Sequence, residues 1–266
     1  MKLRLVSFWL FSFIFLSTGF ASAQEEHAAG VITEFSGAVE IKKEGAEKPE
    51  PITAQTQNLS LYQNDTLTTG ADGSTKITLS DGTVLTLAPN TAIVLQKTDD
   101  HITVELKTGK MRVDCKSDSF TLKTPHHTFT GAGASLEVAV PQKNEVTVFC
   151  IDGKPTVTDR ENGFQIFPEE GQVFTVKYKY DEETKKVEFE VKADEYNEED
   201  LNCKAKGKEY PIRPGGRLVA DFSLEVIIIF PPVPPVPPVP PKEPKDKPYE
   251  DADDIYPLPV VTPKKP

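Results

Sequence analysis

The sequence predicts an all-β protein, a β-sandwich or short β-solenoid of many short strands, followed by a disordered proline-rich tail. Apolar residues recur at every second position through much of residues 30–230, and turn residues separate these runs. Helical apolar spacing is almost absent, which argues against an α/β fold. The predicted parts are an export signal (1–23), a main β domain (30–176), an additional β-rich module or extension (177–230) and the tail (231–266).

The first 23 residues have the three parts of a secretory signal. Lys2 and Arg4 give a positive start, residues 5–20 are mostly apolar, and signal peptidase would read the small residues Ala21 and Ala23. We expect cleavage after Ala23, which leaves Gln24 as the new N-terminus and places the protein in the periplasm or outside the cell. An uncleaved membrane anchor is the alternative, although the apolar run is short for a span of about 20 residues.

The chain is acidic, with 41 Asp and Glu against 30 Lys and Arg among its 266 residues and a formal charge of -11. Signal cleavage would remove Lys2 and Arg4 but no acid, which takes this charge to -13. Such a chain repels phosphate backbones and anionic membrane surfaces. We therefore expect no nucleic-acid partner, and membrane contact only through an uncleaved signal.

Two hairpins, one buried strand and one polar stretch stand out in the pattern. Residues 75–79 and 83–87 alternate on either side of an Asp-Gly turn, and residues 177–191 give a second hairpin. Residues 226–230 are apolar throughout and too few to cross a membrane, so they predict a buried strand. Residues 192–203 are rich in acids and predict a polar loop or one short helix.

A glycine followed by two inward-facing positions recurs three times along the chain. The glycine supplies a tight turn, and the residues two and four positions later fill the core. The spacing between the copies is irregular, so they predict a recurring turn-then-strand unit and no solenoid repeat. The copies are Gly37-x-Val39-x-Ile41, Gly109-x-Met111-x-Val113 and Gly153-x-Pro155-x-Val157.

Three cysteines remain after export, and two of them end alternating runs. Cys115 closes residues 111–115 and Cys150 closes residues 146–150, so both should point inward with the apolar residues before them. In an oxidising compartment they could form a disulfide, and two buried unreactive thiols are the alternative. Cys203 is either free or replaces one of the two in such a bridge.

We find no pattern of catalytic, cofactor-binding or metal-binding residues in the sequence. It lacks a G-x-S-x-G elbow, an H-E-x-x-H zinc motif, a phosphate-binding loop and a dinucleotide fingerprint. His126 and His127 are adjacent, and adjacent strand residues face opposite sides, so they should not share a metal ion. Paired acids such as Glu169-Glu170 predict a solvated surface. We therefore expect no enzyme, cofactor or metal.

Seven short motifs between residues 37 and 172 follow one another in a set order, and the central one is the most specific because it joins an Asp-Gly turn, alternating leucines and Pro-Asn. The motifs are Gly37-Ala38-Val39, Asn64-Asp65-Thr66-Leu67-Thr68-Thr69-Gly70, Leu79-Ser80-Asp81-Gly82-Thr83-Val84-Leu85-Thr86-Leu87-Ala88-Pro89-Asn90-Thr91, Leu106-Lys107-Thr108-Gly109-Lys110-Met111, Phe120-Thr121-Leu122-Lys123-Thr124-Pro125, Val146-Thr147-Val148 and Glu170-Gly171-Gln172.

In order and spacing, these motifs resemble the FecR-domain family. The resemblance implies an extracytoplasmic β domain, which in the best-known members senses an outer-membrane transporter and controls a cytoplasmic sigma factor. Residues 1–4 alone would face the cytoplasm, so this chain resembles the freestanding exported members, and we expect the anti-sigma region to be missing. Where the family usually has Arg-Gly-Thr-x-Phe, this chain has Ala132-Gly133-Ala134-Ser135-Leu136, so a role tied to that arginine is not expected.

The tail begins with three Pro-Pro-Val repeats, which predict a polyproline II rod because each proline fixes φ and lacks a backbone donor. At about 3.1 Å per residue, residues 231–241 would span roughly 35 Å, as a spacer or as a docking ligand. The sequence as a whole predicts a non-catalytic binding or sensing module that engages an envelope protein or a cell-wall glycan. The alternative is a structural spacer or scaffold that displays the β domain on its tail.

Overall fold

The computed structural model describes residues 27–53, 58–98, 101–118, 120–195, 197–221 and 225–229. The expected export signal, its cleavage site and the proline-rich tail lie outside these residues. The described part is all β: it contains strands β1 to β21 and turns, and it offers no helix long and apolar enough to cross a bilayer.

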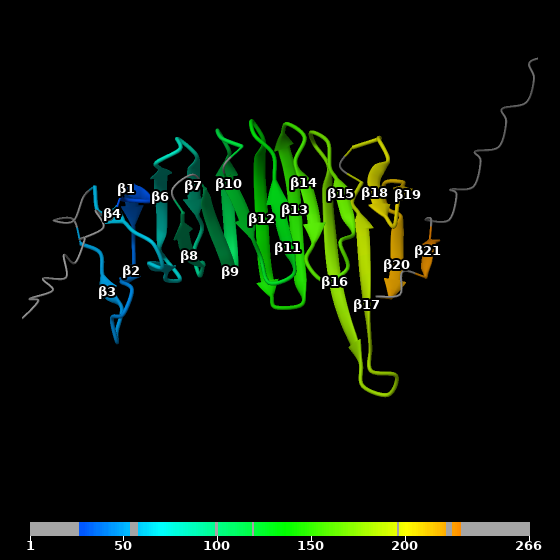
Figure 1. The fold of residues 1–266 in the computed structure, drawn as a ribbon, viewed down its shortest axis with the longest axis horizontal. Coiled ribbons are helices and arrows are strands. Elements are labelled where there is room, and N and C mark those ends of the chain that lie inside the picture. Colours follow the sequence, from blue (N-terminus) through cyan, green and yellow to red (C-terminus); the bar gives the residue numbers. More distant parts are fainter. Residues whose placement is uncertain are drawn as a thin grey trace, which may run out of the picture. The chain divides into compact units, whose positions relative to one another are not determined.

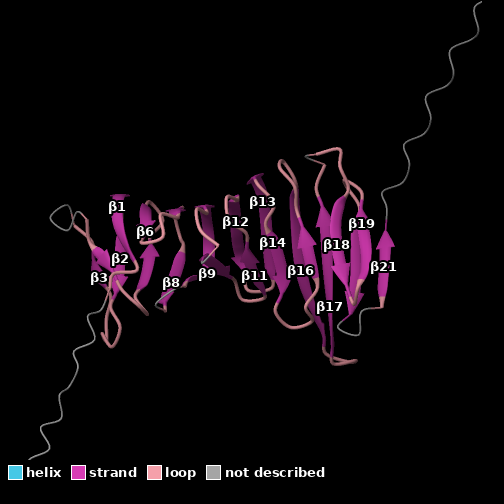
Figure 2. Cartoon of the chain, turned by 45° about the horizontal axis from the view of Figure 1, so that its top comes forward, coloured by secondary structure: helices cyan, strands magenta, loops and turns pink. Residues whose placement is uncertain are grey.

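Two sheets enclose one hydrophobic core, and Figures 1 and 2 show their strands side by side along the body. In sheet A the order is β4 (Ser60–Leu61), β1 (Gly30–Ser36), β6 (Ser74–Leu79), β7 (Val84–Leu87), the second half of β9 (Ile102–Asp114), β12 (Ser135–Gln142), β13 (Glu145–Asp152), β16 (Val173–Asp181), β17 (Lys186–Ala193), β20 (Arg217–Asp221) and β21 (Val226–Ile229). In sheet B the order is β3 (Glu50–Pro51), β2 (Val39–Lys42), β5 (Thr66–Thr69), β8 (Ala92–Lys97), the first half of β9, β10 (Phe120–Lys123), β11 (His127–Thr130), β14 (Thr156–Asp159), β15 (Gln165–Phe167), β18 (Leu201–Ala205) and β19 (Lys208–Ile212).

From β10 onward the chain advances by hairpins that alternate between the sheets. The hairpins β10–β11, β14–β15 and β18–β19 lie in sheet B, and β12–β13, β16–β17 and β20–β21 lie in sheet A. The first strand of each new hairpin pairs with the last strand of the preceding hairpin in its own sheet, as β16 does with β13. Strands β16 to β21 therefore continue the same two sheets.

The inward residues of the strands form the core, as the alternation predicts. In β13, Val146, Val148 and Cys150 are buried while their neighbours are partly exposed. The predicted hairpin across the Asp81-Gly82 turn is confirmed, with Thr75 opposite Leu87 and Thr78 opposite Val84.

Strand β9 passes from one sheet to the other at a glycine of the recurring unit. Its residues up to Thr108 pair with β8 in sheet B, and its residues from Gly109 onward pair with β12 in sheet A. Gly109 has a φ of 96°, a conformation that glycine adopts far more easily than other residues. The tight turn that we expected there is a crossing within one continuous strand.

Two further expectations meet different outcomes in the structure. Of the stretch expected to be a polar loop or one short helix, residues 194–200 contain no helix among those described and form the loop, whereas residues 192–193 belong to β17 and residues 201–203 belong to β18. The prediction of a buried strand at residues 226–230 is wrong on burial, because β21 is an edge strand whose Ile227 is 65% exposed. An edge strand has one paired neighbour, and the described pairing of β21 is with β20.

Candidate functional site

A buried polar network joins the two sheets near the C-terminal half of the body. Tyr178 of β16 donates its phenol O–H to Oδ2 of Asp159, which ends β14. Nε2 of His127, the first residue of β11, lies 3.1 Å from the same phenol oxygen. All three side chains are buried, so the network links sheet A to sheet B within the core.

The protonated state of Tyr178 sets the direction of the hydrogen bonds in this network. Burial, and then the charge of Asp159, raise the pKa of Tyr178 far above its ordinary value, so the phenol keeps its proton and donates it. The phenol oxygen can then accept a hydrogen from Nε2 of His127. This leaves Nδ1 of His127 as an acceptor, and the described structure gives it no partner.

The Asp159 carboxyl also holds the turn that follows β14. Its Oδ1 accepts the backbone N–H groups of Glu161 and Asn162, each at 3.0 Å. The Arg160 N–H donates to the backbone oxygen of His126 at 2.8 Å, which ties this turn to the one before β11. One buried carboxyl therefore fixes a surface turn and the position of Tyr178 together.

The two adjacent histidines both contact Tyr178, which the sequence did not lead us to expect. His126 lies in the turn before β11, outside the strand, and its ring stacks on the Tyr178 ring at 4.1 Å between centroids. Its Nε2 lies 2.9 Å from the Lys143 oxygen. No cluster of three His, Cys, Asp or Glu side chains in the described ranges could hold a metal ion.

The neutral state of His127 makes stability depend on pH. Burial lowers its pKa to about 4, against the opposing charge of Asp159, and the nearby His126 lowers it further. The unfolded chain takes up this proton below about pH 6.5, whereas the folded chain resists it until about pH 4. This group therefore costs nothing above pH 6.5, and as pH falls from 6.5 to 4 the free energy of unfolding should drop by roughly 3 kcal/mol.

Urea unfolding at pH 7 and pH 4.5 measures this loss. His127→Gln keeps a hydrogen-bonding side chain without a titrating ring, so its unfolding free energy should fall less between the two pH values. The comparison is made within each variant, because the substitution also lowers stability at pH 7. An equal loss in both proteins would show that other groups cause the acid sensitivity.

The hairpin that carries Tyr178 extends past its neighbours as a two-stranded arm, residues 179–187, which projects from the body in Figure 1. The pairing of β13 with β16 ends at Lys177, and the pairing of β20 with β17 ends at Glu188. Tyr180 lies opposite Val187 on the arm, on the same face as Tyr178, and is 59% exposed. The arm therefore continues the core face of sheet A into solvent.

The opposite face of the arm carries charged residues in complementary cross-strand positions. Lys179 lies opposite Glu188, and Asp181 lies opposite Lys186. Asp181 also accepts the N–H groups of Glu183 and Thr184 at 2.9 and 2.8 Å, which shapes the tip. Opposite charges placed directly across a strand pair favour this register.

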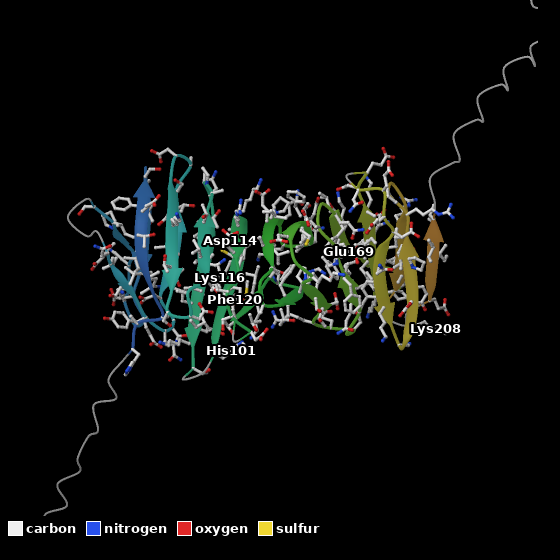
Figure 3. The ribbon with its side chains drawn as sticks, turned by 90° about the horizontal axis from the view of Figure 1, so that it is seen from above. His101, Asp114, Lys116, Phe120, Glu169 and Lys208 are labelled. Carbon is white, nitrogen blue, oxygen red and sulfur yellow. The ribbon has the colours of Figure 1, made fainter. Side chains whose placement is uncertain are left out.

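A shallow acidic cleft of about 530 Å³ lies on the loops beside β13 and β16, and Figure 3 labels one of its residues, Glu169. A hydrogen bond with Glu169 raises the pKa of Glu199, so these two carboxyl groups lie close together. Lys154 lies 3.6 Å from Glu169. The remaining lining residues are Asp152, Gly153, Glu170, Gly171 and Asn197.

All three cysteines are buried and carry free thiols in the structure. Cys115 and Cys150 point inward as predicted, and β12 lies between them, since the Cys115 N–H bonds to Ala134 and Cys150 pairs with Leu136. Strands two places apart are separated by about 10 Å, beyond the reach of a disulfide. Burial raises the pKa of Cys150 to about 11, so its thiol is unreactive at neutral pH.

The fold and these features define a two-sheet, all-β protein with a buried polar network and a projecting arm. The sequence model of the FecR protein family matches residues 65–154, which confirms the resemblance over that stretch. No curated protein matches the sequence significantly.

Two crystal structures of a candidate anti-sigma factor from Parabacteroides distasonis ATCC 8503, at 2.50 Å and 1.65 Å, are similar to this chain. Each shares 17% identity with it at a TM-score of 0.39. The similarity covers 56% of this chain and spans 59% of the length of the other.

Proposed function

We propose that the protein is an exported, non-catalytic binding or sensing module of the bacterial cell envelope. Its β body engages an envelope protein or a cell-wall glycan, and the arm provides the contact. Support comes from the FecR match over residues 65–154 and from the signal pattern at the N-terminus. The observation that carries the proposal is the exposed Tyr180 on a projecting hairpin.

The arm has the properties of a binding element. Tyrosine is enriched among residues that dominate binding energies, because it offers a large rigid surface with one polar end. Tyr180 is two residues from Tyr178, which the buried Asp159 holds in place, so the arm is fixed at its base. A side chain that is ordered before binding loses less conformational entropy when a partner covers it.

The buried network does not have the properties of an active site. Asp159, Tyr178 and His127 would be suited to proton transfer, but a substrate would have to reach them, and all three are buried. Their hydrogen bonds join the two sheets. In the described residues this chemistry therefore holds the fold together, and binding is assigned to the exposed arm above it.

Crosslinking in cells, followed by mass spectrometry of the captured material, tests this function. Tyr180→Ala should reduce capture of the main envelope partner by about tenfold, the loss typical of an interface anchor. Glu182→Ala, in the same hairpin tip, is the matched control and should capture as much as the wild type. Because Tyr180 is exposed, its variant should unfold at the same urea concentration as the wild type.

Two outcomes of that experiment would contradict the proposal. Equal capture by Tyr180→Ala and the wild type would remove the arm from the interface. Capture that disappears only when residues 231–266 are deleted would favour the alternative of a spacer or scaffold built on the tail.

A further inference from the structure

Among the described strands, three of the four outer edges of the two sheets carry features that prevent further strand pairing. Strands β3 and β4 are two residues long, and β3 contains Pro51. Strand β19 combines Lys208, labelled in Figure 3, with Glu209 and Pro211. Short length, charge and proline are the usual means by which proteins keep their edge strands unpaired.

The fourth edge, β21, contains neither a charged residue nor a proline. Its sequence is Val-Ile-Ile-Ile, and its described pairing is with β20 alone. Ile227 and Ile229 share the outer face and are 65% and 39% exposed. An uncharged apolar edge strand is a template for another strand, so β21 differs from the other edges in the property that governs association.

The pattern of sheet A indicates how a further strand would join. The last strand of each sheet A hairpin pairs antiparallel with the first strand of the next one, as β13 does with β16 and β17 with β20. After β21 the sequence continues with Pro-Pro-Val repeats, and prolines cannot donate to a ladder. The segment that follows directly in the chain is therefore unsuited to this position.

We infer that β21 pairs antiparallel with β21 of a second copy of the chain, about a twofold axis perpendicular to sheet A and centred on Ile228. Directly opposite residues of an antiparallel pair have their side chains on the same face. An axis through Ile228 therefore keeps the outer faces of the two copies of sheet A on the same side. It places Ile227 opposite Ile229 of the second copy, and Ile228 opposite its equivalent. The four outer isoleucines of the two copies then form one apolar patch, and a self-complementary contact closes as a dimer.

The charges near β21 permit this pairing. Glu225 directly precedes the strand. The twofold axis places the two copies of Glu225 at opposite ends of the strand pair that the two copies of β21 form. Within β21 the paired segment covers residues 227–229 of each copy, because Val226 would lie opposite the residue after the strand; it is smaller than standard interfaces, and both chains are acidic. The dimer should therefore be concentration-dependent, and added salt should strengthen it by screening the repulsion.

Sedimentation equilibrium of the full chain, at two salt concentrations, measures the dimer directly. Ile227→Glu places a carboxylate opposite an isoleucine twice per dimer and should weaken association by about tenfold or more. Ile229→Lys should weaken it similarly. An equimolar mixture of the two variants should recover a heterodimer of at least wild-type affinity, because the introduced glutamate and lysine then lie opposite each other.

A cysteine pair tests the register independently of affinity. Ile228→Cys should give a covalent dimer on mild oxidation, since the two equivalents meet at the axis, whereas Glu225→Cys should remain monomeric. Under reducing conditions Glu225→Cys should keep the urea midpoint of the wild type, and Ile228→Cys should lower it modestly, because Ile228 is partly buried on the core face opposite Leu218. A wild-type chain that is monomeric at all concentrations, or a mixture of charge variants that binds no better than either alone, would overturn the inference.

Discussion

Replacing Asp159 by alanine is expected to lower the free energy of unfolding by about 4 kcal/mol, because three hydrogen-bond donors lose their acceptor together. Two are the backbone N–H groups of Glu161 and Asn162, which shape the turn after β14. The third is the phenol O–H of Tyr178, which lies in the core and cannot turn to water. Urea unfolding at pH 7 measures this loss.

Asp181 provides the matched control, because it makes the same turn in an exposed position. Its carboxyl accepts the N–H groups of Glu183 and Thr184, two and three residues on, as Asp159 does with Glu161 and Asn162. Asp181→Ala leaves those donors in contact with water, so it should change stability far less. Equal losses in the two variants would mean that the turn, rather than the buried network, accounts for the effect.

A second variant isolates the contact between the sheets. Tyr178→Phe removes the phenol O–H and leaves the turn of Asp159 intact, so it should lose about 1–3 kcal/mol. In the double variant Asp159→Ala, Tyr178→Phe no phenol O–H is left unsatisfied, so its loss should be smaller than the sum of the two single losses. Additive losses would indicate that the two side chains act independently.

Periodicity in the sequence predicted many of the strands and their inward faces, although it missed β18, which begins inside the stretch expected to be a polar loop or a short helix. The Asp81-Gly82 hairpin, the β16–β17 hairpin and the inward direction of Cys115 and Cys150 all follow from residues of alternating character. The sheet that each strand joins could not be predicted, because an alternating strand has one apolar face in either sheet. The crossing of β9 between the sheets does interrupt its apolar pattern, because buried Leu106 is followed by buried Met111 an odd number of positions later, and we interpreted this break as a turn.

The candidate site was harder to predict because its parts come from distant strands. Asp159 follows Val157 at an inward position, and a carboxyl there is a signal that the sequence offered. Its partner Tyr178 could not be assigned, since the sequence does not indicate which inward residue of the other sheet faces it. The exposure of Ile227 depends on β21 being the last strand, and the length of the arm depends on where β13 and β20 end. Neither the exposure of Ile227 nor the length of the arm is determined by the residues of its own segment.

Replacing Gly109 by alanine is expected to lower the free energy of unfolding by about 3 kcal/mol or more. Its φ of 96° disfavours any side chain, and a Cβ there would lie 2.4 Å from Cα of Thr91 and 2.6 Å from the oxygen of Asn90. Both atoms belong to backbone, so relief would require moving the loop before β8 away from the point where β9 changes sheets. Thermal and urea unfolding measure the loss.

Gly207 separates the two causes of this loss. It has a φ of 76° in the turn between β18 and β19, and a Cβ there would meet no atom within 4 Å. Gly207→Ala therefore pays only the conformational term, about 1–2 kcal/mol. A larger loss at Gly109 than at Gly207 would show that close backbone packing, and not φ alone, requires glycine where β9 joins the sheets. Equal losses would mean that the crossing has room for a methyl group.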